Sequence, residues 1–267
     1  MASINSDSKL TLFLWPEGFF PKQIAYFLLL KGIADSPSQI YDGKTNDPRL
    51  AINLLHFNGV SIEAVDKKDP KPAGKSSPCL RIVDPSGTHP ECWVHESASI
   101  RLLLEELYPD KSPLISSTML DRALMNDIQS SVLQAFTDCN YYIKNAASVT
   151  TSWSGMKNED RSLAVARHAK QNMVRALLKA QELAAENLKE TGWLTPGLDH
   201  PGLVDVVLSG GARYMELSYA LNLFEDERFG LLRDWYSRFK QLSWWDEFEE
   251  SGRHPKELAY DSDCREV

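Results

Sequence analysis

Strand patterns and helix patterns occupy different halves of this 267-residue chain, and this division limits the possible folds more than any other feature. Up to about residue 110, runs of β-forming residues alternate with helical segments. Beyond about residue 114 we find helical periodicity alone. It covers residues 117–147, 161–188, 203–222 and 229–242. A domain usually contains roughly 100–150 residues, so the sequence predicts two domains: residues 1–110, with strands and helices, and residues 111–267, with helices only.

The composition disfavours several classes of protein. Apolar residues make up 43% of the chain and charged residues 25%, as in an ordinary globular protein. The net charge of -8 repels nucleic acid and anionic membranes. The longest apolar run is too short to cross a bilayer, and the first residues do not resemble a secretory signal. We therefore expect a cytoplasmic protein with no membrane partner and no nucleic-acid partner.

Neither the four cysteines nor the six histidines show the spacing of a metal site. The cysteines are dispersed, so we expect reduced thiols rather than a disulfide framework. Cys264 is followed by charged residues where a prenylation motif has aliphatic ones, and we interpret it as part of a solvated tail. Phosphate-loop, dinucleotide and serine-hydrolase signatures are also missing. The sequence thus predicts no metal.

The first half begins with a β–α–β unit. Residues 10–15 are rich in β-formers and end at a Pro-Glu-Gly turn, and residues 21–32 form an apolar helix that Gly32 can cap. A polar loop then leads to a second strand over residues 50–56. Residues 62–77 contain several lysines and prolines, which predicts a basic, irregular connection.

A β-hairpin and a helix complete the first half. Residues 79–83 and 91–95 flank a loop rich in Pro and Gly, which is typical of an antiparallel hairpin. An amphipathic helix follows from Ser97 and stops at a Tyr-Pro-Asp sequence. Two short motifs lie at the junctions: Ser77-Pro78 comes before the hairpin, and Glu96-Ser97 lies between the hairpin and the helix.

This order of elements, with these two motifs, resembles the cytosolic glutathione S-transferases, in which an α+β thioredoxin-like domain precedes an all-helical domain. The chain is similar to a divergent, fungal-type member. The resemblance implies glutathione as co-substrate and a homodimer. It also implies that a cis bond at Pro78 directs the backbone of Ser77 to the cysteinyl part of glutathione, and that Glu96 and Ser97 hold the γ-glutamyl part. Lys75, in the basic loop, is the candidate partner of the glycyl carboxylate.

Each of these residues also has a purely structural interpretation. Pro78 can be a trans proline that starts a strand, and Ser97 can be an ordinary helix N-cap. Lysines in a proline-rich loop are usually solvated, and Lys67 and Lys71 are alternatives to Lys75.

The chain departs from the family at the sulfur-binding position. Active transferases place a Tyr, Ser or Cys there, which hydrogen-bonds the glutathione sulfur and favours the thiolate. In this chain the expected position falls at or beside Gly18, and residues 15–21 contain no hydroxyl or thiol. Glu17 is a candidate base for a carbon acid or an alcohol, with an exposed turn carboxylate as the alternative. The backbone amides of Gly18–Phe20 are a further way to stabilise a thiolate.

A second departure concerns folding. The segment from Leu198 to Asp205 resembles the capping box that starts the central helix of the second domain in this family. Gly202 occupies the cap position in place of Ser or Thr, and Asp205 lies three residues later.

Three functions stay open. The first is glutathione conjugation, or glutathione-dependent isomerisation or elimination. Its substrate would be a small, planar, apolar molecule, for example an aromatic compound of secondary metabolism. The second is a glutathione-independent isomerase or cyclase that uses Glu17, and the third is a non-catalytic binding module. For an enzyme, the resemblance implies an apolar pocket between the domains. Its candidate lining residues are Met125, Gln129, Phe136 and Tyr142, and the alternative, more common for such residues, is a place in the core.

Overall fold

The computed structural model describes residues 7–259 and divides the chain into two compact units. The first unit contains Met1–Leu114 together with Leu242–Pro255. The second contains Ile115–Gln241 and Lys256–Val267. Cys264 lies outside the described residues.

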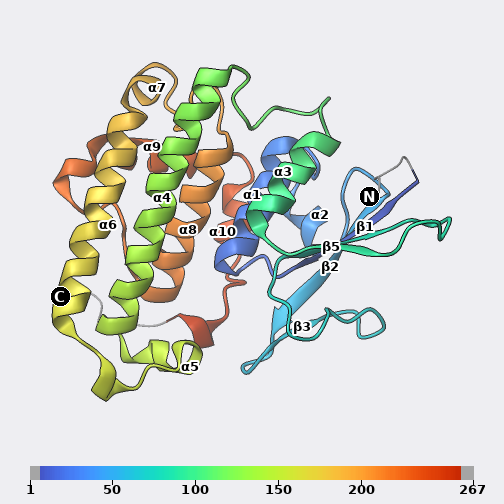
Figure 1. Cartoon of the computed structure of the whole chain (residues 1–267), viewed down its shortest axis with the longest axis horizontal. Coiled ribbons are helices and arrows are strands. Elements are labelled where there is room, and N and C mark those ends of the chain that lie inside the picture. Colours follow the sequence, from blue (N-terminus) through green and yellow to red (C-terminus); the bar gives the residue numbers. More distant parts are fainter. Residues whose placement is uncertain (1–6, 260–267) are drawn as a thin grey trace. The chain divides into compact units, whose positions relative to one another are not determined.

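The first unit is built on a five-stranded mixed sheet in the order β3-β2-β1-β4-β5 (Figure 1). Its strands are β1 (Lys9–Leu14), β2 (Leu50–Phe57), β3 (Ile62–Ala64), β4 (Cys79–Val83) and β5 (Cys92–Val94). The central strand β1 runs parallel to β2 and antiparallel to β4. The predicted β–α–β unit and hairpin are confirmed, whereas the short strand β3 occupies the start of the segment predicted to be irregular.

Helix α1 (Phe19–Lys31) connects β1 to β2 and is buried over most of its surface. Gly32 ends it with φ 72°, in the left-handed region that glycine adopts without steric cost. Its two lysines are buried because each has a carboxylate partner: Lys22 lies 2.7 Å from Glu249, and Lys31 lies 3.0 Å from Glu105. The other helices of this unit are α2 (Pro37–Tyr41), α3 (Ser97–Leu107) and α10 (Trp245–Glu249).

The segment Leu242–Pro255 belongs to the first unit although it follows the helices of the second in sequence. Its aromatic side chains pack around Tyr26 of α1, with ring centroids 4.9 Å away at Trp244 and 5.5 Å away at Phe248. The Tyr26 hydroxyl also donates a 2.6 Å hydrogen bond to Glu249. Apolar burial and a paired buried carboxylate therefore hold α10 against α1.

The second unit is helical throughout its described part (Figure 1). Its α-helices are α4 (Met119–Ala146), α5 (Thr151–Ser154), α6 (Leu163–Leu183), α7 (Ala185–Glu190), α8 (Leu203–Tyr219) and α9 (Gly230–Phe239). Short 3-10 turns occur at Ser148–Thr150, Asn158–Asp160, Glu227–Phe229 and Lys256–Leu258. Long α4 and α6 pack side by side, and α8 is the most buried helix of the group. Within residues 7–259, none of the helices is both long and apolar enough for a membrane span.

The start of α8 is organised by the buried carboxylate of Asp205. Gly202 is the N-cap and Asp205 occupies the third helical position, as predicted, and the Gly202 amide donates a 2.9 Å hydrogen bond to Asp205. The hydroxyl that a Ser or Thr cap would provide comes instead from Thr195, which accepts a 3.1 Å hydrogen bond from the Val204 amide. A Cβ on Gly202 would lie 2.7 Å from that hydroxyl oxygen, so glycine is required by space.

Candidate functional site

Strand register brings the predicted binding motifs to one edge of the sheet. Cys79, the first residue of β4, lies opposite Phe13 near the end of β1. Val94, the last residue of β5, lies opposite Leu80. The residues that follow β1, precede β4 and follow β5 therefore share this edge. They are the start of α1, the Ser77-Pro78 motif and the Glu96-Ser97 motif.

The Ser77–Pro78 peptide bond is cis, as the family resemblance implied. Pro78 is buried, and Ser77 is half-buried beside the end of β1. The Ser77 hydroxyl accepts a 3.3 Å hydrogen bond from the Trp15 amide. This bond joins the motif directly to the turn that leads into α1.

Helix α3 begins at Ser97, with Glu96 as its N-cap residue in an extended conformation. No side chain caps the helix there, so the first amides of α3 are left for another partner. Ser97 is buried, with 8% of its surface exposed, and Glu96 is exposed. The ordinary structural interpretation, in which Ser97 is the N-cap, does not hold, because Ser97 is the first helical residue.

Gly18 is the N-cap residue of α1, and this helix also has no side-chain cap. The Gly18 amide donates a 3.0 Å hydrogen bond to the Trp15 carbonyl, which closes the turn. A Cβ at residue 18 would lie only 2.7 Å from the Trp15 ring. The indole of Trp15 thus occupies the space that a side chain at residue 18 would need.

Glu17 is buried beside this turn, with 9% of its surface exposed, rather than lying in solvent. It accepts a 2.9 Å hydrogen bond from the Tyr41 hydroxyl of α2. Burial raises the pKa of Glu17, while the Tyr41 bond and the charges of Lys22 and Arg253 oppose that rise. The Arg253 guanidinium lies 3.9 Å from the centre of the Tyr41 ring. A buried carboxyl group with a raised pKa is a candidate general acid or base.

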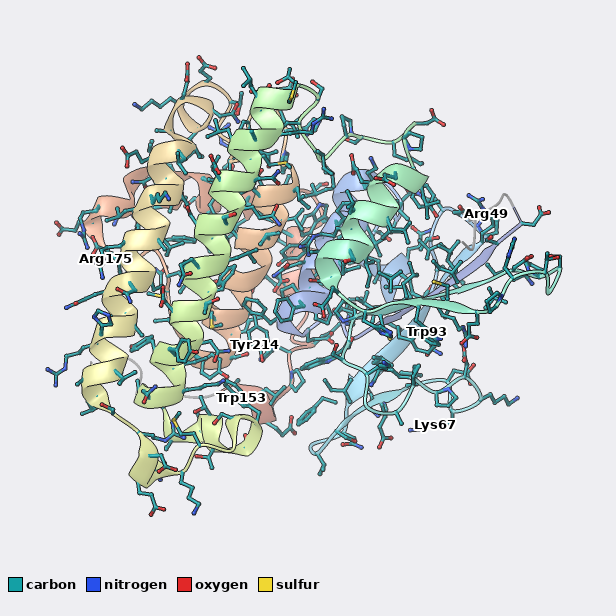
Figure 2. The ribbon with its side chains drawn as sticks, in the orientation of Figure 1. Arg49, Lys67, Trp93, Trp153, Arg175 and Tyr214 are labelled. Carbon is teal, nitrogen blue, oxygen red and sulfur yellow. The ribbon has the colours of Figure 1, made fainter. Side chains whose placement is uncertain are left out.

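The lysines of the basic loop differ in their surroundings. Lys67 is paired with Glu63 at 2.6 Å, and Figure 2 shows it on the loop that follows β3. The Lys71 ammonium donates to the Lys75 carbonyl and so holds the loop together. Lys75 itself is exposed and lies two residues before Ser77.

The four residues predicted to line an apolar pocket lie in the second unit. Met125, Phe136 and Tyr142 are buried in the helical unit, and Gln129 is half-buried. Among residues 7–259, no group of three or more His, Cys, Asp or Glu side chains is arranged to hold a metal ion.

Sequence reasoning missed Tyr41 and Arg253. Neither lies in a motif, and both come near Glu17 only through the folding of distant segments.

Comparison with solved structures agrees with this architecture. A glutathione transferase family member from Pseudomonas fluorescens, with bound S-(propanoic acid)-glutathione, matches with a TM-score of 0.59 and 16% identity over 90% of this chain and 97% of that one. The chain has the glutathione S-transferase fold. A maleylacetoacetate isomerase from Anaeromyxobacter dehalogenans, with bound dicarboxyethyl glutathione and citrate, matches this fold with a TM-score of 0.57 and 16% identity, covering 94% and 96% of the two chains.

A third structure with the same fold is FzlA from C. crescentus. It matches with a TM-score of 0.58 and 15% identity, and the match covers 92% of this chain and 96% of FzlA. No protein-family model matches the sequence, and neither does any curated protein. At these identities the likeness shows the fold alone.

Proposed function

We propose that this chain is a glutathione-dependent enzyme that acts on a small apolar molecule by conjugation, isomerisation or elimination. The observation that carries the proposal is the convergence, at one sheet edge, of the Ser77-Pro78 motif and the uncapped starts of α1 and α3. Two solved structures with this fold hold glutathione derivatives, which supports the assignment.

Each site residue has a role in this proposal. The backbone of Ser77, turned by the cis bond at Pro78, pairs with the cysteinyl part of glutathione. Ser97 and the first amides of α3 bind the γ-glutamyl carboxylate, because a helix N-terminus favours an anion, and Glu96 binds the amino group. Lys75 pairs with the glycyl carboxylate.

The sulfur would be held at the start of α1. Because no hydroxyl is present on residues 15–21, the backbone amides of Gly18–Phe20 are the donors that can favour a thiolate. They replace a single strong hydrogen bond with the weaker field of a helix terminus. We therefore expect little activity toward substrates that depend on a fully formed thiolate, such as aryl halides.

A second candidate function rests on Glu17. Its buried position, its bond to Tyr41 and its raised pKa are typical of a general acid or base. In this alternative the chain is an isomerase or cyclase that does not use glutathione. A non-catalytic binding module is the third outcome, and it would follow if neither glutathione nor Glu17 mattered.

Retention on immobilised glutathione separates these functions. We expect the wild type to bind and Ser97→Ala to flow through, with an affinity in solution more than tenfold weaker. Ser99→Ala is the matched control, because Ser99 lies in the same helix and is exposed. Its retention should equal that of the wild type. Wild-type protein that flows through would contradict the glutathione assignment and favour the Glu17 alternative.

A further inference from the structure

Arg101 is a buried cation without a carboxylate partner among residues 7–259. It lies on α3 with 3% of its surface exposed, and its Nη1 donates a 2.8 Å hydrogen bond to the Gln23 side-chain oxygen on α1. Its Nε atom and the Gln23 Nε2 atom are buried with no hydrogen-bond partner. Burying an isolated charge destabilises a folded protein, so a functional role would account for the burial of Arg101.

The two buried lysines of α1 differ from Arg101, because each forms an ion pair with a carboxylate. Lys22 is paired with Glu249, and Lys31 with Glu105, at 2.7 and 3.0 Å. Arg101 instead faces a neutral amide of almost the same shape as glutamate. Burial lowers the pKa of Arg101 to about 10, so the guanidinium still carries its charge at neutral pH.

The position of Arg101 relates this charge to the start of α3. Ser97 and Arg101 are four residues apart, so they lie on the same helix face, about 6 Å apart along the axis. Long side chains on a helix lean toward its N-terminus. The positive charge of Arg101 therefore adds to the field of the helix dipole at the uncapped amides near Ser97.

We propose that Arg101 is a positioning residue for the carboxylate that binds at the start of α3, and that Gln23 keeps its charge uncompensated. This inference rests on the proposed function. In it, the positive charge of Arg101 attracts the γ-glutamyl carboxylate that binds near Ser97. A unit charge several ångströms away in a partly buried setting changes an anion's affinity by about tenfold. A glutamate at position 23 would cancel the field without changing the shape of the pair.

The decisive variant is therefore Gln23→Glu, which retains the hydrogen bond to Arg101 and supplies a counterion. Titration calorimetry should show glutathione binding about tenfold weaker, with an unchanged or higher melting temperature. Gln23→Met is the matched control, because it removes the hydrogen bond but leaves the charge uncompensated, and its affinity should stay within twofold of the wild type. Equal affinities for the wild type and Gln23→Glu would overturn the inference.

A second readout does not depend on glutathione. Ser97→Cys, made together with Cys92→Ser and Cys264→Ser, places a titratable thiol at the start of α3. Ultraviolet thiolate absorbance should give a pKa about one unit higher when Gln23→Glu is added. The neighbouring groups Glu96 and His95 are the same in both proteins. A pKa that does not change would overturn the role of Arg101, whereas a wild type that binds no glutathione overturns the proposed function instead.

Discussion

The absence of a side chain at residue 18 follows from the packing of one neighbouring residue. The Trp15 ring fills the space beside Gly18, and the same turn leaves Glu17 buried against Tyr41. A single Gly18→Ser change would therefore disturb Trp15 before its hydroxyl could act. The residue before Gly18, Glu17, places a buried carboxyl group close to the start of α1.

The raised pKa of Glu17 has a direct consequence for stability. Because the folded state binds this proton more tightly than the unfolded state, the wild type loses stability as the pH rises from the ordinary carboxyl pKa of 4.5 through the folded value. Glu17→Gln keeps an oxygen for the Tyr41 hydroxyl and carries no charge. We expect it to gain stability relative to the wild type between pH 4 and pH 8.

Urea unfolding across this pH range measures the effect. Glu225→Gln is the control, since Glu225 is exposed. Glu17→Gln should gain stability relative to this control as the pH rises. If Glu17→Gln behaves like this control, the Glu17 carboxyl group is not perturbed and its candidacy as an acid or base fails.

Among the elements, α8 is capped by side chains that lie outside its N-cap position. Asp205 accepts hydrogen bonds from Leu194, Thr195, Gly202 and Trp235, at 2.7 to 3.1 Å. Burial raises the pKa of Asp205, and these donors oppose that rise. The network joins the loop before α8 to α9, and its donors stabilise the buried carboxylate.

This network predicts that Gly202→Ser destabilises the protein, although serine is the better N-cap in an isolated helix. The new Cβ would lie 2.7 Å from both Thr195 and Leu198, so the loop must shift. Thr195→Val should destabilise as well, by about 1–3 kcal/mol, because it removes the hydroxyl from a buried network. Thr137→Val on the exposed surface of α4 is the control for urea unfolding. A more stable Gly202→Ser protein would refute this account of the cap.

For the whole molecule, we predict a two-fold dimer. The family resemblance implies it, and α4 carries exposed apolar side chains that an isologous interface can bury, including Met119 at 79% and Leu120 at 83% exposure. Light scattering at micromolar concentration should give about twice the chain mass of 30.1 kDa. A particle with the mass of one chain would contradict the prediction.

The sequence by itself determined the division into a mixed half and a helical half, the β–α–β unit, the hairpin and the position of Asp205 at the start of α8. These features depend on local periodicity and turn residues, which neighbouring positions encode. Short elements such as α2 and β3 were missed, because three to five residues carry too little pattern.

Tertiary structure alone decided the surroundings of the candidate site. The contacts of Glu17 with Tyr41, of Lys22 with Glu249 and of Arg101 with Gln23 join residues that are 24, 227 and 78 positions apart. No local pattern specifies such pairs, because they form only when the packing of helices against the sheet brings distant segments together. The same packing buries these charged groups, and burial raises the pKa of Glu17 and lowers that of Arg101.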